Sequence, residues 1–144
     1  MEIRTASDKD VEMERALLLE CRLPIDGVPE ELECLLVAAV NARIVGVAGL
    51  ELHDGDGLMR AVAVSPDSQR RGLGSQLCDA IERQAELVGA RRLFLLTETA
   101  DPFFRKRGYR SVERVLAPTE IASSVEFSAV CPASAVLMVR ECLR

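Results

Sequence analysis

Short apolar runs and one long amphipathic segment dominate the pattern of hydrophobic and polar positions along the chain. Several runs have the length and composition of β-strands: residues 3–5, 35–40, 44–52, 58–64, 91–97, 109–115 and 135–142. After residue 64, apolar residues recur at near-helical spacing: Leu73, Leu77, Ile81, Ala85 and Val88. This periodicity predicts a helix over about 73–88, ended by Gly89. The helix would connect two neighbouring parallel strands in a βαβ unit.

Weaker signals predict the remaining elements. Ser7, followed three residues later by Asp10, is typical of a helix N-terminus, and this helix should extend to about Cys21. A short helix is expected over 101–107 and a further helical turn within 118–124. Turn residues at 41–43 and 53–57 predict two hairpins. The fold class is therefore α/β, with a mixed and mostly antiparallel sheet.

Length and composition narrow the class of protein. A chain of 144 residues predicts one domain, residues 1–144, and 49% hydrophobic residues are enough to fill its core. The net charge of −5 argues against nucleic acid or an anionic membrane as a partner. No apolar stretch is long enough to span a bilayer and the first residues are charged, so we expect a cytoplasmic protein. The five cysteines lack CxxC spacing, which favours reduced thiols and no metal site.

The most informative segment is Gln69-Arg70-Arg71-Gly72-Leu73-Gly74, between a predicted strand and the long helix. Two glycines allow close approach of the backbone to phosphate oxygens, and a helix N-terminus presents free N–H groups with a positive dipole end. The pattern is neither a P-loop nor a GxGxxG dinucleotide motif. It therefore predicts a pyrophosphate site, although an exposed turn before an amphipathic helix would have the same pattern.

The order of elements and the segment VAVSPDSQRRGLGSQL resemble the GNAT superfamily of acyl-CoA-dependent N-acyltransferases across nearly the whole chain. The family motif Q/R-x-x-G-x-G/A is matched by Gln69, Gly72 and Gly74, and ADPFFRKRGY resembles the second family signature. The C-terminal segments ERVLAPTEI and EFSAVCPASAVLM resemble a narrower group, the arsenic-resistance N-acetyltransferases. The resemblance implies a GNAT fold with helices on both faces and a central parallel pair splayed around acetyl-CoA.

The same resemblance assigns the coenzyme site. Backbone amides of 70–75 would bind the pyrophosphate, and main-chain groups of the strand before the loop would pair with pantetheine. The strand ends near Val64 and Thr97 should part to admit the thioester. The residues implied are Val62, Val64, Gln69, Arg70, Arg71, Gly72, Leu73, Gly74, Ser75, Phe103, Phe104 and Arg107.

In GNAT enzymes the amine attacks the thioester directly, so the protein positions the reactants and accepts a proton. Phe104 stands where many members have a tyrosine acid, and a phenyl ring cannot donate a proton. We expect Tyr109 to be a core residue. Glu51 and Glu98 are the candidate bases, whereas His53 lies in a predicted turn and should be exposed.

The acceptor pocket is expected to form from residues 22–29, 97–99 and 131–134, with Thr97 and Ser134 as contacts. Arg60 replaces an acidic residue that many amine-acetylating relatives have, and its guanidinium could bind a carboxylate or oxyanion. An ion pair with Glu51 across the hairpin is the equal alternative.

These observations predict an N-acetyltransferase that moves an acetyl group from acetyl-CoA to a small, anionic primary amine, such as an amino acid or an arsenic- or phosphorus-containing analogue. Two alternatives stay open: a protein or peptide N-acetyltransferase, and a CoA-binding sensor without turnover, which Phe104 makes plausible. Exposed strand edges are compatible with a homodimer.

Overall fold

A computed structural model describes residues 1–23, 25, 28, 32–69, 71–124 and 134–142 of the chain. The predicted coenzyme contact of Arg70 lies outside the described residues, as do parts of the predicted acceptor segments at 22–29 and 131–134.

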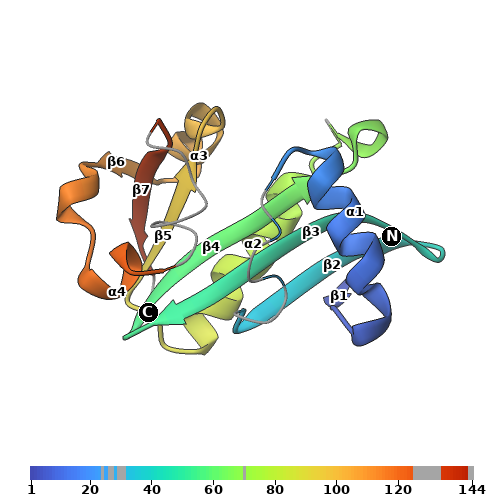
Figure 1. Ribbon diagram of the computed structural model, residues 1–144, viewed down its shortest axis with the longest axis horizontal. Coiled ribbons are helices and arrows are strands. Elements are labelled where there is room, and N and C mark those ends of the chain that lie inside the picture. The colour runs from blue at the N-terminus through green and yellow to red at the C-terminus, as the bar shows by residue number, and fades with distance from the viewer. Residues whose placement is uncertain (24, 26–27, 29–31, 70, 125–133, 143–144) are drawn as a thin grey trace.

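The described strands form one mixed sheet in the order β1-β2-β3-β4-β5-β7-β6 (Figure 1). The strands are β1 (Glu2–Thr5), β2 (Cys34–Val40), β3 (Arg43–His53), β4 (Asp56–Val64), β5 (Arg92–Thr97), β6 (Arg110–Val112) and β7 (Val136–Glu141). Only β4 and β5 pair in parallel, and the other neighbours pair antiparallel. The predicted mixed sheet with a central parallel pair is confirmed.

Helices cover both faces of this sheet. The helices are α1 (Val11–Glu20), α2 (Leu73–Leu87), α3 (Asp101–Lys106) and α4 (Thr119–Ala122), with short 3-10 turns η1 (Asp8–Asp10), η2 (Pro66–Ser68) and η3 (Arg114–Leu116). The core is divided accordingly. One cluster packs α2 against the sheet, a second packs α1 against the opposite face, and a third joins Ile121 of α4 to β4, β5 and β7.

The amphipathic pattern that predicted α2 also explains where it lies. Leu77 and Ile81 are fully buried against the sheet, as their helical spacing requires. Gly46 on β3 lets the helix approach closely, because a Cβ at this position would lie 2.8 Å from Cδ1 of Leu77. The position of α2 fixes its first turn at the end of the sheet where β4 terminates.

A β-bulge separates β4 from β5. The parallel pairing runs from Asp56 opposite Arg92 to Met59 opposite Leu95 and then stops. On the other side of β4 the register with β3 shifts next to Ala61, which adopts a left-handed conformation with φ of 59°. A bulge bends its strand, so the last residues of β4 leave β5, as Figure 1 shows for the upper ends of the two strands.

Of two element boundaries predicted from the sequence, one is confirmed and one is wrong. The N-terminal cap is confirmed, since the Ser7 amide donates to the Asp10 carboxylate over 2.8 Å. The predicted strand 109–115 was too long, because β6 ends at Val112 and the chain turns through η3. The Arg114 guanidinium donates to the carbonyl of Ala135 there, which holds the turn against the start of β7.

Candidate functional site

A cleft of about 780 Å³ opens where β4 and β5 part. Its walls come from the end of α1, the separated ends of β4 and β5, and the first residues of α3. The cleft lies where the sequence placed a thioester, between Val64 and Thr97, and both residues line it.

Main-chain groups of β4 face this cleft. The Ser65 amide donates to the Val45 carbonyl on β3, over 2.8 Å. Because alternate residues of a strand point their main-chain groups to opposite sides, those of Val64 and Val62 point toward the gap left by β5. The Val64 carbonyl accepts from the Gln69 side chain at 3.0 Å and from the Cys21 thiol at 3.4 Å. The wall of the cleft is therefore a free strand edge, capped at one carbonyl.

The predicted phosphate loop is the N-terminus of α2. Gly72 caps this helix with φ of 77°, a left-handed conformation that favours glycine. The first turn of α2 contains no acidic residue. The amides of its first residues lack partners within the helix, so they can bind an anion. The Leu73 side chain is buried in the core, which leaves only its amide for the predicted role, and Arg71 is exposed.

Aromatic side chains form the wall opposite β4. Phe103 and Phe104 line the cleft and pack edge to face, with ring centroids 5.0 Å apart. Tyr109 lies behind them, 3% exposed, which agrees with the predicted core position. Burial, together with the neighbouring Glu82 carboxylate, raises the pKa of the Tyr109 hydroxyl far above its ordinary value. The Tyr109 hydroxyl donates to Glu82, and Tyr109 is not among the described residues that line the cleft.

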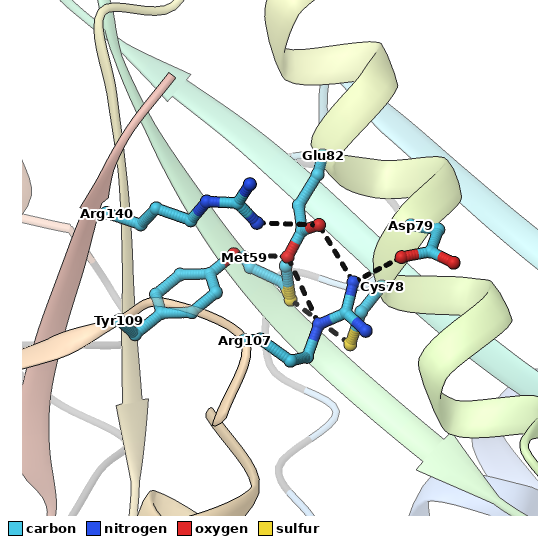
Figure 2. Close-up of polar contacts among 7 residues, drawn as sticks. All are labelled: Met59, Cys78, Asp79, Glu82, Arg107, Tyr109 and Arg140. Atoms are coloured by element: carbon cyan, nitrogen blue, oxygen red, sulfur yellow. Dashed lines mark hydrogen bonds and ion pairs between the residues drawn. The ribbon is translucent and has the colours of Figure 1, made fainter. Parts of the chain in front are cut away.

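Arg107 does not lie where the sequence predicted. Its guanidinium turns to α2, where it contacts Glu82 over 2.8 Å and Asp79 over 2.5 Å (Figure 2). It is absent from the cleft lining among the described residues. Arg105 likewise pairs with Asp101, one helical turn away on α3. Acidic side chains nearby thus pair with both arginines, including Arg107, which the family resemblance had assigned to the coenzyme.

Glu51, Arg60 and His53 form a buried polar group on the sheet face that carries α1. The Arg60 guanidinium donates to Glu51 at 2.9 Å, and Nε2 of His53 lies 2.6 Å from the other Glu51 oxygen. The ion-pair alternative for Arg60 is therefore what the structure contains. Glu51 is 1% exposed and is not among the described residues that line the cleft, whereas its partner Arg60 lines it. His53, predicted to be exposed, is half-buried by this contact.

The other predicted site residues are Glu98 and Thr97, at the end of β5, and Ser134, just before β7. Glu98 is exposed and lines the cleft. Thr97 also lines it, and its hydroxyl accepts from the Ala100 amide at 3.0 Å, which fixes the turn into α3. Ser134 is exposed but does not line the cleft within the described part of the chain.

Sequence reasoning missed two features of this region. Cys21 lies at the cleft wall, although the sequence predicted only a reduced thiol at this position. Glu82 contacts the side chains of Arg107, Tyr109 and Arg140 (Figure 2). Its one signal was an acidic pair, Asp79 and Glu82, on the same face of the predicted helix, and this spacing does not reveal the partners.

The described residues also lack the features of two other kinds of site, a metal centre and a membrane-spanning helix. No group of three or more His, Cys, Asp or Glu side chains there is arranged to hold a metal ion. None of the helices in that part of the chain is both long and apolar enough to cross a membrane.

The model of the acetyltransferase (GNAT) domain family matches residues 31–111, more than half of the chain. The chain belongs to this family. The matched segment of the GNAT domain includes β4, β5 and α3, which line the cleft, and also Gly72 and α2.

Known proteins agree with this assignment. An amino-acid acetyltransferase from Ralstonia nicotianae is 41% identical over 68 residues, covering 46% of this chain and 15% of that protein. The chain therefore spans only a small part of this curated relative. N-acetylglutamate synthase from Neisseria gonorrhoeae, solved with coenzyme A and N-acetyl-glutamate, has a TM-score of 0.83 at 23% identity and covers 99% of this chain and 35% of that chain. Rv2747 from Mycobacterium tuberculosis, in complex with CoA and NLQ, has a TM-score of 0.82 at 23% identity, covering 99% of this chain and 100% of that chain. These structures share the GNAT fold.

Proposed function

We propose that this GNAT domain is an acetyl-CoA-dependent N-acetyltransferase that acts on a small amine. One observation carries the proposal: the cleft between β4 and β5 has a strand edge along one wall, and Gln69, which lines this cleft, lies three residues before Gly72, the N-cap of α2. A strand edge can pair with the amides of a pantetheine arm, and a helix N-terminus can bind a pyrophosphate. Known GNAT structures solved with coenzyme A support this choice of ligand.

In this proposal the coenzyme extends from the loop to the strand edge. The amides of 70–75 bind the pyrophosphate, with Arg70 and Arg71 adding positive charge. Main-chain groups of Val62 and Val64 pair with pantetheine, and Gln69 holds the end of β4 through the Val64 carbonyl. Phe103 and Phe104 cover the opposite side of the arm. Residues 1–144 act as one domain, since the described strands share one sheet.

The chemical step is direct transfer. The neutral amine attacks the thioester carbon, the C–S bond breaks, the amide forms, and the ammonium proton leaves to a base. Glu98 is our candidate base, because it is an exposed carboxylate that lines the cleft. Glu51 could accept this proton only by way of water, since Arg60 and His53 occupy its oxygens. The departing thiolate takes its proton from water, because Phe104 cannot supply one.

For the acceptor we propose an amino acid or an anionic analogue of one, including arsenic- and phosphorus-containing compounds. The names of the related amino-acid acetyltransferases support an amino acid. An acceptor carboxylate that reaches Arg60 would share the guanidinium with Glu51. Thr97 also lines the cleft, and Ser134 is next to Ala135, which lines it. The arsenic-containing acceptor rests on the C-terminal segments alone.

Release of free CoA thiol from acetyl-CoA tests both the acetyl transfer and the choice of an anionic amine as acceptor. The assay compares amino acids, their phosphinic and arsonic analogues, and neutral amines of similar size. We expect turnover with an anionic amine, and Arg60→Ala should raise its KM far more than that of a neutral amine. Equal effects would leave Arg60 with a structural role only. If the protein binds CoA but releases no thiol from acetyl-CoA with any of the amines, the sensor alternative is favoured. Phe104 supports this alternative, because it stands where many family members have a tyrosine.

A further inference from the structure

We propose that Glu82, a residue of α2 outside the cleft, positions the aromatic wall against which the coenzyme packs. This inference rests on the function proposed above. Glu82 is not among the described residues that line the cleft, so it does not contact the reacting atoms. It is therefore a positioning residue rather than a catalytic one.

The Glu82 carboxylate accepts hydrogen bonds from two side chains and forms an ion pair with a third, all from outside α2 (Figure 2). Arg107 donates from Nη2 at 2.8 Å and from Nε at 3.3 Å, and the Tyr109 hydroxyl donates at 2.9 Å. Arg140 of β7 lies 3.0 Å away. The carboxylate is only 13% exposed, so water competes weakly for these contacts. One acidic side chain therefore joins α2, the end of α3 and β7.

Two of these donors contact the phenyl rings that line the cleft. The Arg107 guanidinium carbon lies 5.9 Å from the centroid of the Phe103 ring. The Tyr109 ring packs edge to face on Phe104, with centroids 5.5 Å apart. The Tyr109 amide also donates to the Phe104 carbonyl at 3.1 Å, which ties this tyrosine to α3. Contacts thus run without a break from Glu82 to both rings of the wall.

The same helix begins at the phosphate loop. Leu73 follows Gly72 directly, and the rise from Leu73 to Glu82 is about 14 Å along a straight helix. Because a helix is stiff over this length, Glu82 sets the distance between the loop that would bind pyrophosphate and the rings that would flank pantetheine. Loss of its charge should loosen one wall of the cleft while the loop remains in place.

Asp79 provides a matched control on the same helix. It also contacts the Arg107 guanidinium, but its side chain is 71% exposed and Figure 2 joins it to Arg107 alone. Removing its charge takes one acidic partner from Arg107 and leaves the Tyr109 and Arg140 contacts of Glu82 intact.

The experiment compares Glu82→Gln, Asp79→Asn and Tyr109→Phe with the wild type. CoA affinity is measured by calorimetry, and KM and kcat by thiol release. For Glu82→Gln we expect about tenfold weaker CoA binding, equal to about 1.4 kcal/mol, and a similar rise in the acetyl-CoA KM. The acceptor KM and kcat should change less than about twofold, because no reacting atom is touched. Tyr109→Phe should weaken CoA binding about threefold, and Asp79→Asn less than about twofold.

A lower melting temperature of Glu82→Gln with unchanged CoA affinity would overturn the inference, because Glu82 would then serve stability alone. If Glu82→Gln does not fold, Tyr109→Phe decides, and wild-type affinity in that variant contradicts the inference. Failure of the proposed function is a separate result: the wild-type protein itself would then bind no CoA.

Discussion

Glu14 is a carboxyl group buried without a partner, which makes its effect on stability measurable. The residue lies on α1 and is 1% exposed, and neither carboxylate oxygen has a hydrogen-bond partner among the described residues. Burial, with the nearby Asp10 carboxylate, raises the Glu14 pKa to about 7, although Arg15 and Arg4 act in the opposite direction. The folded protein therefore holds this proton up to neutral pH.

The sign of the effect follows from the two states. Below about pH 4.5 Glu14 is protonated in both the folded and the unfolded chain. Between 4.5 and 7 only the unfolded chain releases the proton, so the free energy of unfolding falls by about 1.4 kcal/mol per pH unit. The total loss amounts to about 3 kcal/mol at pH 8, a large fraction of the stability of a small domain.

Glu14→Gln removes this proton release from the folding equilibrium. Urea denaturation at intervals from pH 5 to pH 8 should show the variant gaining about 2–3 kcal/mol relative to the wild type over that range. The cost of burying an amide is the same at every pH and does not affect the difference. Glu12→Gln, at an exposed position of the same helix, should follow the wild type. Parallel curves for Glu14→Gln and the wild type would refute the reasoning.

Three further predictions concern charged groups. Hydrogen bonds from Arg4 and the Ser7 amide lower the Asp10 pKa to about 2, so the free energy of unfolding falls as the pH drops from about 4 to 2. In urea titrations over this pH range, Asp10→Asn should lose about 1–2 kcal/mol less than the wild type. Arg60→Met should lower the free energy of unfolding by about 3–5 kcal/mol, because Glu51 is left buried without its cation. The double variant with Glu51→Met should recover most of this loss in urea denaturation. Equal losses in the single and double variants would contradict a buried ion pair. Glu98→Gln should lower kcat by about a hundredfold in the thiol-release assay, and an unchanged kcat would exclude it as the base.

Periodicity made most of the fold predictable. The spacing of Leu77 and Ile81 located α2, and the turn residues located both hairpins, because these signals depend on neighbours in the sequence. The bulge at Ala61 carried no such signal, since its left-handed conformation arises from pairing with β3. The separation of β4 from β5 was therefore expected from the family resemblance rather than from the residues themselves.

The candidate site was predictable where main-chain groups form it and less so where long charged side chains choose among partners. Gly72 caps α2 as the motif implied. Arg107 was assigned to the coenzyme by the family resemblance, yet in the structure its guanidinium pairs with Glu82 and Asp79 of α2. For Arg60 the sequence left acceptor binding and an ion pair with the candidate base Glu51 as equal alternatives, and the structure contains the ion pair. Such choices depend on tertiary distances that a sequence pattern does not contain.

Calorimetric titration of CoA into a Gly72→Leu variant tests the central claim most directly. A Cβ at Gly72 would meet no atom of the protein within 4 Å, so the leucine side chain would extend into the space assigned to the pyrophosphate. Gly89→Leu is the control, because Gly89 has a similar φ of 82° and equally open surroundings at the other end of α2. We predict that Gly72→Leu folds and binds CoA at least about a hundredfold more weakly than Gly89→Leu, a difference of about 3 kcal/mol. Equal affinity of the two variants would contradict the assignment of this loop to the coenzyme.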